Sequence, residues 1–215
     1  MVPDDIVARL GRLYTATLSN ALEDVGEDGV ILGLPAVGPG MRLAGRAMCV
    51  LQISGPAGTF LVSDFKVGTT IDAAAPGDVV VVANGGNCVS SWGGTASYAA
   101  KLKGIAGLVV DGGVRDREEM IALGFPVFAR HLVPTTGRTR LRVVEIGGTV
   151  TVSGQRVTTG DVVVADGTGV VCIPAEKAGD VLRIAEALAA DDAEAVAAIG
   201  QGMTFAEAMA RFRKI

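Results

Sequence analysis

Histidine is almost absent from this sequence, which has one among its 215 residues, His131. A Ser-His-Asp triad or a zinc site with histidine ligands would have to use it, and no nucleophile-elbow motif lies nearby. We therefore interpret His131 as a structural or loop residue that follows a predicted strand. Cysteine is scarce too, and Cys49, Cys88 and Cys172 lack the paired spacing of metal ligands. We expect reduced thiols and a cytoplasmic protein.

Several motifs that would identify other protein classes are missing. No apolar run reaches the length of about 18 residues that a membrane helix needs, and the acidic N-terminus lacks a signal-peptide core. The net charge is −4 without a basic cluster, which argues against nucleic acid as a partner. No phosphate-binding P-loop occurs, and the glycine-rich segment 84–94 lacks the dinucleotide fingerprint. What remains is carboxylate chemistry with a hard cation such as Mg²⁺ or Mn²⁺.

The pattern of apolar residues predicts one α/β domain over residues 1–215. Helices are expected at both ends, in residues 1–28 and 175–215, around an α/β core in residues 46–173. A chain of this length can bury a core without disulfides. The last helix is expected at residues 205–214, where Thr204 and Glu207 form a capping-box pattern.

Two strand–helix–strand units are expected in the core. Residues 79–110 form the first, with a right-handed parallel crossover, and its first strand is expected to end at the segment 84–87 (NGGN). The second has a helix at 117–123 and a strand at 126–129. Later strands are joined by glycine-rich turns, including a hairpin at Asp166-Gly167.

The segment 107–120 (GLVVDGGVRDREEM) carries the strongest functional signal. A short buried strand is expected to end in a turn at residues 111–113, because glycines permit tight turns. Arg115 and Asp116 follow directly, before the helix at 117–123. Open α/β sheets bind their ligands at the carboxyl ends of strands, so these two residues are candidates for a site.

Asp116 and Glu119 are candidate metal ligands, because residues three apart on a helix face the same side. Alternatively, both acids interact only with the positive end of the helix dipole. Arg115 favours the first interpretation, since a cation gains nothing from that end of a helix. Its planar fork suits a carboxylate ligand.

A second candidate anion site lies at the start of the preceding helix. After Trp92, the residues Gly93, Gly94, Thr95 and Ala96 begin a helix directly after a strand, so free backbone N–H groups can bind an anion there. Alternatively, the two glycines only permit close packing between helix and sheet. We assign the indole of Trp92 to packing.

The residues resemble a known family. The segments WGG, AAKLKGIAGLVVDGGVRD, GFPVFAR and GDVVVADGTGVVCIP, with TATLSNALEDVG near the start, are similar to the class II pyruvate aldolases that cleave 4-hydroxy-4-methyl-2-oxoglutarate. Their RraA-like relatives are named as regulators of ribonuclease E activity. The resemblance covers residues 15–188 and implies a swivelling β/β/α fold. It also implies homotrimers or hexamers with active sites between subunits.

The resemblance also implies roles for individual residues. Arg115 would bind the carboxylate and ketone of a 2-oxo acid, Asp116 would hold Mg²⁺ or Mn²⁺, and the amides of residues 93–96 would face the pyruvyl carboxylate. One branch of the family has an acidic residue at the position of Gly94. A second branch has glycine there and an acid at the position of Glu119, which matches this sequence. That branch is associated with aldolase and oxaloacetate decarboxylase activity.

Two other functions remain open. The family's other name implies a non-catalytic protein-binding regulator of a ribonuclease. An older family label, demethylmenaquinone methyltransferase, ranks last, because the sequence has no glycine-rich nucleotide turn with an acidic partner to hold S-adenosylmethionine.

Overall fold

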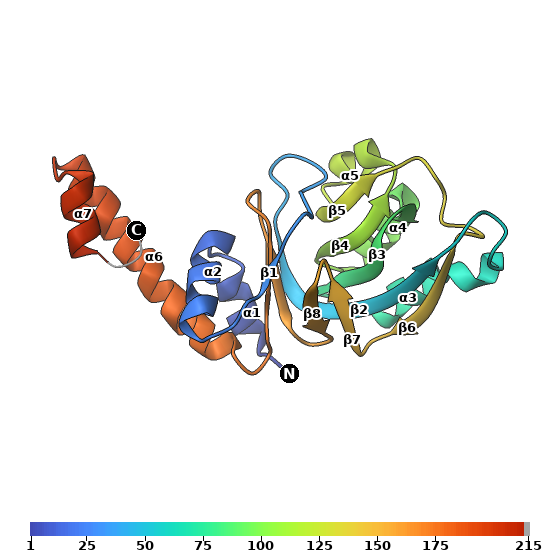
Figure 1. Cartoon of the computed structure of the whole chain (residues 1–215), viewed down its shortest axis with the longest axis horizontal. Coiled ribbons are helices and arrows are strands. Elements are labelled where there is room, and N and C mark those ends of the chain that lie inside the picture. The colour runs from blue at the N-terminus through green and yellow to red at the C-terminus, as the bar shows by residue number, and fades with distance from the viewer. Residues whose placement is uncertain (213–215) are drawn as a thin grey trace.

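The computed structural model describes residues 1–212 and has the α/β architecture expected from the sequence (Figure 1). Within these residues, eight strands form one mixed sheet in the order β1-β10-β9-β2-β3-β4-β5, with β6 paired to β2, and β7 and β8 form a separate hairpin. The strands are β1 Val30–Ile31, β2 Leu43–Ser54, β3 Asp78–Trp92, β4 Gly107–Val114, β5 Val127–Leu132, β6 Leu141–Ile146, β7 Thr149–Val152, β8 Gln155–Thr158, β9 Val162–Ala165 and β10 Val170–Ile173. The helices are α1 Asp4–Leu10, α2 Thr15–Asp24, the 3₁₀-helix η1 Val62–Phe65, α3 Val67–Ala73, α4 Gly94–Lys103, α5 Arg117–Leu123, α6 Ala178–Gly200 and α7 Phe205–Arg211.

Four parallel strands, β2 to β5, form one half of the sheet, with β5 at its edge. Their apolar runs are buried on both faces, as is typical of parallel strands covered by other elements. The parallel β3–α4–β4 unit is confirmed, and so are the bounds of α5. Because β3 and β4 are each followed by a helix, the starts of α4 and α5 lie at the same edge of the sheet.

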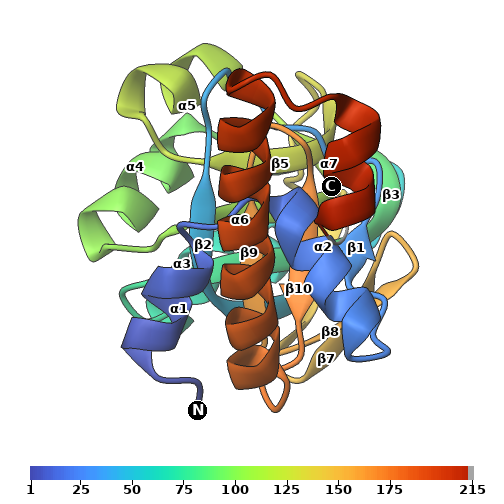
Figure 2. The same ribbon diagram turned by 90° about the vertical axis from the view of Figure 1, so that its left-hand side faces the viewer.

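The β9–β10 hairpin separates two apolar cores, because alternate side chains of a strand point to opposite faces. Val162 and Val164 belong to a core shared with α1, α2 and α6, whereas Val163 and Ala165 belong to the core of the main sheet. The predicted turn at Asp166-Gly167 is confirmed. Figure 2 shows α6 in front of this hairpin with α1 and α2 beside it. Among residues 1–212, no helix has the length and apolar character needed to cross a membrane.

Two predicted strand ends were wrong. β3 does not stop at the segment 84–87 but runs on to Trp92, and β4 passes through the predicted turn at 111–113 to Val114. Gly85 and Gly86 have φ of 59° and 73° and accommodate a register shift rather than a chain reversal. Gly112 and Gly113 instead allow neighbouring side chains to lie close to the backbone of β4. A Cβ on Gly112 would lie 2.9 Å from Asn84 Nδ2, and one on Gly113 would lie 2.6 Å from Val133 Cγ2.

Other differences concern element ends. β5 extends beyond the predicted strand to Leu132, so His131 is a strand residue and does not follow the strand. The first residue of α2 is Thr15, and its backbone N–H donates to the carboxylate of Asp166 at 2.9 Å, so the cap comes from the distant hairpin. The predicted capping box at the start of α7 is confirmed. That helix ends at Arg211, and the predicted end at residue 214 lies outside the described residues.

Candidate active site

The starts of α4 and α5 meet at the carboxyl ends of β3 and β4. Gly93 is the N-cap of α4, and Asp116, with φ of 60°, is the N-cap of α5. The backbone N–H of Arg115 donates to the carbonyl oxygen of Trp92 at 3.1 Å, which joins the end of β4 to the end of β3. A left-handed backbone is tolerated by aspartate better than by most side chains. The local backbone therefore holds Arg115 and Asp116 beside the first turn of α4.

The carboxylate of Asp116 lies against that turn. Its Oδ2 accepts a hydrogen bond from the backbone N–H of Gly94 at 3.0 Å, and Arg115 Nε lies 3.4 Å from the same oxygen. A Cβ on Gly93 would lie 2.5 Å from Oδ2, so this glycine leaves the room that the carboxylate occupies. The side chains of Arg115 and Asp116 remain 45% and 34% exposed, so a ligand can reach both.

Glu119 approaches Gly94 from the first turn of α5. Its Oε2 lies 1.6 Å from the place where a Cβ on Gly94 would sit. The carboxylate of Glu119 thus fills the space that a side chain at position 94 would need. Both acids contact Gly94. Asp116 accepts a hydrogen bond from its amide, and Glu119 lies against its Cα.

A cavity of about 320 Å³ opens beside Arg115 and Asp116, and we call it the central cavity. Its polar side also includes the exposed Thr95, on the first turn of α4, and Thr136. Its apolar lining, which we call the apolar wall, consists of Phe65, Val67, Ile71, Trp92, Ala96 and Ala99. This combination of an apolar wall with a few convergent polar groups is typical of small-molecule sites.

Glu119 does not line the central cavity. It faces a neighbouring cavity of about 460 Å³ together with Gly94, Thr95 and Tyr98. The two predicted metal ligands therefore converge on Gly94 but open on different cavities, with Thr95 lining both.

The acids present fit a hard cation better than zinc. Within residues 1–212 there is no group of three or more histidine, cysteine, aspartate or glutamate side chains that could hold a metal ion. Asp116 and Glu119 therefore offer two carboxylates at most. Mg²⁺ is commonly bound through one or two carboxylates and retains several waters, whereas structural zinc requires four protein ligands. The residues present thus fit Mg²⁺ or Mn²⁺ held partly through water and substrate.

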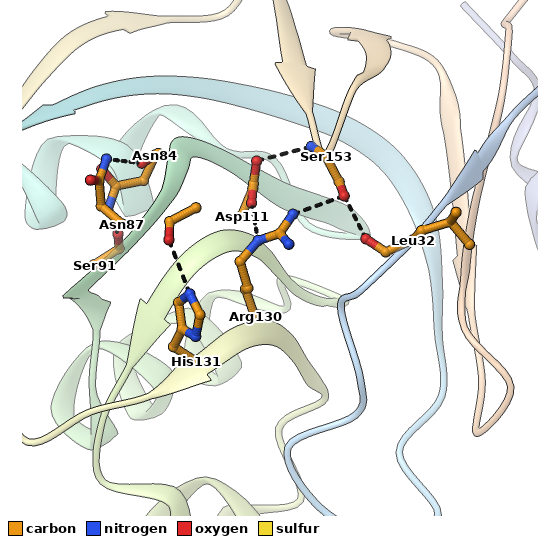
Figure 3. A network of polar contacts seen from close by, with 9 residues as sticks. Leu32, Asn84, Asn87, Ser91, Asp111, Arg130, His131 and Ser153 are labelled. Atoms are coloured by element: carbon orange, nitrogen blue, oxygen red, sulfur yellow. Dashed lines mark hydrogen bonds and ion pairs between the residues drawn. The ribbon is translucent and has the colours of Figure 1, made fainter.

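A second polar cluster, shown in Figure 3, lies deeper in the sheet. The buried Asp111 accepts a hydrogen bond from Arg130 Nε at 2.6 Å and another from the backbone N–H of Ser153 at 2.9 Å. Arg130 Nη2 donates to Ser153 Oγ at 2.8 Å, which in turn donates to the carbonyl oxygen of Leu32. These bonds connect β4 and β5 to the β7–β8 hairpin. This ion pair was not predicted from the sequence, although an aspartate inside an apolar strand signals a buried partner.

His131 also contacts this part of the sheet. Its Nε2 lies 3.0 Å from the carbonyl oxygen of Gly86, in the segment where β3 shifts register (Figure 3). The ring nitrogen therefore donates to the backbone of β3.

The apolar wall of the central cavity was not anticipated. Phe65, Val67 and Ile71 come from η1 and α3, and none of them was predicted as a site residue. Thr136 follows β5 and was not singled out either. No local signal identifies these residues, because their role depends on contact with elements far away in the chain.

The three cysteines are free, as expected. Burial is the main cause that raises the pKa of the Cys49 thiol to about 11, and it also raises the pKa of Cys172. Both thiols belong to the core of the main sheet, and they stay protonated at neutral pH.

Comparison with known proteins gives sequence relatives for much of the chain. The profile of the RraA-like family, described as Aldolase/RraA, matches residues 15–172. A protein of Halalkalibacterium halodurans, named as a putative 4-hydroxy-4-methyl-2-oxoglutarate aldolase, is 34% identical over 145 residues, which are 66% of this chain and 69% of that protein. The chain spans half or less of two other curated relatives, 50% of an uncharacterized protein of Methanocaldococcus jannaschii and 33% of Legionella pneumophila DlpA.

Solved structures share the fold. An uncharacterized protein from Pseudomonas syringae superposes with a TM-score of 0.87 at 28% identity, over 96% of this chain and 98% of its own. Streptomyces coelicolor RraAS2, described as an unusual member of the RNase ES inhibitor RraA protein family, gives 0.77 at 26% identity, over 94% and 99%. These matches confirm the fold implied by the sequence resemblance. The chain belongs to the RraA-like family.

Proposed function

We propose that this protein is a divalent-metal-dependent class II pyruvate aldolase that cleaves 4-hydroxy-2-oxo acids and also decarboxylates oxaloacetate. The observation that carries the proposal is the placement of Arg115 and Asp116 side by side in one cavity, against the first turn of α4. The name of the Halalkalibacterium halodurans relative supports the same reaction type.

Substrate binding is assigned to Arg115 and to the helix start. The guanidinium group of Arg115 can donate two parallel hydrogen bonds to the carboxylate of a 2-oxo acid or to its carboxylate and keto oxygens. Thr95 and Ala96 line the same cavity in the first turn of α4, where backbone N–H groups have no acceptor within the helix. The amide of Gly94 already donates to Asp116, so of the predicted helix-start residues Gly93, Thr95 and Ala96, which line the cavity, remain for the substrate.

In aldol cleavage, negative charge develops on the oxygen of the pyruvate enolate, and the site must stabilise it. As the C3–C4 bond breaks, its electron pair stays on C3 and forms the enolate of pyruvate, while the C4 hydroxyl loses its proton and becomes a carbonyl. Arg115 stabilises the negative charge on the enolate oxygen because it is already in position. Asp116 and Glu119 would hold a divalent ion, which supplies Lewis-acid polarisation of the 2-oxo group when bound. Oxaloacetate loses CO₂ to give the same enolate, and in both cases C3 is then protonated.

The C4 hydroxyl proton needs a base. A water held by the carboxylate of Asp116 or Glu119 can accept it, since both carboxylates lie beside the first turn of α4. We further propose a homotrimer or hexamer, with a neighbouring subunit completing the site. Light scattering should give the mass of three or six subunits, and a stable monomer at micromolar concentration would contradict the assembly.

The test is pyruvate release from several 4-hydroxy-2-oxo acids and from oxaloacetate, with Mg²⁺ or Mn²⁺ and then with EDTA. Arg115→Lys keeps the charge but loses the planar fork, so turnover of both substrate types should fall together by about tenfold or more. Arg117→Lys is the matched control, because Arg117 Nε donates to the carbonyl oxygen of Val37 and does not line the cavity.

The regulator function is the second candidate, supported by the structural similarity to RraAS2. If pyruvate release is absent or independent of metal, the aldolase proposal fails. Inhibition of a ribonuclease by the same preparation would then favour the regulator.

A further inference from the structure

A short chain of buried hydrogen bonds runs from the end of β3 into α4, beside the central cavity. The indole Nε1 of Trp92 donates to the hydroxyl of Ser97 at 3.1 Å, and that hydroxyl donates to the carbonyl oxygen of Gly93 at 3.0 Å. A hydroxyl group donates one proton and accepts another, so both bonds can exist at once. The indole, assigned to packing from the sequence, thus also forms a hydrogen bond. We call this chain of two bonds the indole–serine bridge.

The bridge closes the corner where β3 passes into α4. The backbone N–H of Ser97 also donates to the carbonyl oxygen of Gly93, at 3.0 Å. A serine hydroxyl that binds the carbonyl group four residues earlier is common in helices and by itself stabilises little. Here the indole binds that hydroxyl from the strand, and both side chains are buried, Trp92 at 3% and Ser97 at 0% exposure. The end of the strand is therefore tied to the first turn of the helix.

The N-cap residue of α4 cannot fix this corner with a side chain. A Cβ on Gly93 would lie 2.5 Å from Asp116 Oδ2 and 3.1 Å from Arg115 Nε, which excludes the serine, threonine or aspartate that usually caps a helix. Such a cap would also take the N–H of the second or third helical residue, here Thr95 and Ala96. The bridge instead holds the turn through a carbonyl oxygen. Both N–H groups thus stay free of side-chain bonds from residues 1–212.

The backbone of Trp92 is bound to the other half of the site. Its carbonyl oxygen accepts hydrogen bonds from the backbone N–H of Arg115 at 3.1 Å and from the hydroxyl of Ser90 at 2.8 Å. Trp92 therefore contacts the helix start through its indole and the exit of β4 through its carbonyl group. Asp116 joins the same two parts through its bond to the amide of Gly94. The position of Arg115 relative to the first turn of α4 depends on both connections.

We propose that Trp92 and Ser97 are positioning residues, which hold the first turn of α4 in the orientation that its free N–H groups need to bind an anion together with Arg115. The inference rests on the proposed function, in which Thr95 and Ala96 lie at the carboxylate of a 2-oxo acid. Hydrogen bonds weaken steeply as their angles change, and small misplacements of a binding group are costly. Loss of the bridge should therefore weaken ligand binding, although Ser97 does not line the central cavity.

Ser97→Ala tests the bridge, and Ser91→Ala is the matched control. Both serines are fully buried and hydrogen-bonded, but Ser91 donates to Gln52 at 2.7 Å and does not line the cavity either. Urea denaturation should show similar losses of stability. In calorimetric titration with Mg²⁺, Ser97→Ala should bind pyruvate about tenfold more weakly, and Ser91→Ala should match the wild type. Equal, measurable affinities of the three proteins, or equal losses in both variants, would overturn the proposal.

A double-mutant cycle tests whether the two side chains act through one bond. Trp92→Phe removes the indole N–H and keeps an aromatic ring in the apolar wall. Ser97→Ala should weaken pyruvate binding less in the Trp92→Phe background than in the wild type, because the bridge is already broken there. Losses that simply add would mean that the side chains act independently, and would contradict the bridge.

Amide hydrogen exchange separates this inference from the function on which it rests. The amides of Gly94 and Ser97 are hydrogen-bonded, so their exchange reports how often the first turn of α4 opens. Ser97→Ala should speed their exchange by about tenfold relative to Ser91→Ala, whether or not pyruvate is a ligand. Faster exchange in a protein whose wild type binds no pyruvate would support the positioning role and overturn the aldolase. Unchanged exchange would overturn the positioning role, even in an active aldolase.

Discussion

Asp111 and Asp116 are five positions apart on β4 and its exit, yet their surroundings are opposite. The side chain of Asp111 is 6% exposed and bound by both Arg130 and the backbone of Ser153. The side chain of Asp116 is 34% exposed and has one backbone hydrogen bond, from Gly94, with Arg115 at a longer distance. One carboxylate is fully bound by the protein, and the other is only partly bound.

The difference separates a structural acid from a candidate catalytic one. A buried carboxylate needs partners for its charge, and Asp111 has them on two other elements, so its contribution is to hold the sheet together. Asp116 keeps an accessible oxygen and a nearby cation, which suits a group that must bind and release a ligand. The same substitution at the two positions should therefore have different consequences.

The largest effect is expected from Asp111→Asn. The amide cannot neutralise Arg130, which would remain largely buried without its anion. We expect the free energy of unfolding to fall by about 3 kcal/mol, measured by urea denaturation. A loss below about 1 kcal/mol would show that the pair contributes little and would remove the contrast with Asp116.

Asp116→Asn should instead affect activity. Asparagine tolerates the left-handed backbone and can still accept the hydrogen bond from Gly94, so stability should change little. Loss of the charge should reduce oxaloacetate turnover by about 10–100-fold, with partial recovery at high Mg²⁺ or Mn²⁺. A stability loss as large as that of Asp111→Asn, with normal specific activity, would reverse the roles assigned to the two acids.

Glu119→Ala should have a smaller effect, because this acid faces the neighbouring cavity. Turnover should fall by about tenfold, and more than the affinity for pyruvate, if Glu119 helps hold the ion or the water that accepts the proton. Glu118→Ala is the matched control, since Glu118 is exposed in the same helical turn. Equal results for both variants would reduce Glu119 to an interaction with the helix dipole.

A smaller effect on stability than that of Asp111→Asn is expected at Asp166, a second buried acid. Burial raises its pKa, but hydrogen bonds from the backbone and hydroxyl of Thr15 and from the backbone of Thr168 outweigh this, so its pKa is lowered overall. A lowered pKa stabilises the fold above the ordinary aspartate value of about 3.9, and this stabilisation is lost as pH falls through the folded value. Asp166→Asn should cost about 1–2 kcal/mol at pH 7. The difference from wild type should shrink in acid, and a constant difference down to pH 3 would contradict this assignment.

Local sequence signals predicted some parts of the molecule well. The helix after Asp116 was placed at its correct bounds, because Gly124 and the apolar spacing are local features. The glycines of β3 and β4 led to wrong strand ends, because a glycine that permits a turn has the same sequence signature as one that permits a register shift or close packing. The apolar wall of the cavity could not be predicted, since Val67 and Arg115 meet only through the tertiary fold. The pairing of Arg130 with Asp111 depends on strand order for the same reason.

The space shared by Gly94 and Glu119 makes the side chains that fit at these two positions depend on each other. A side chain introduced at position 94 would displace the carboxylate of Glu119, because its Cβ would fall 1.6 Å from Oε2. Loss of Glu119 without a replacement would remove an acid from beside the helix start. We therefore expect an acid introduced at position 94 to take the place of the Glu119 carboxylate rather than add a second one beside it.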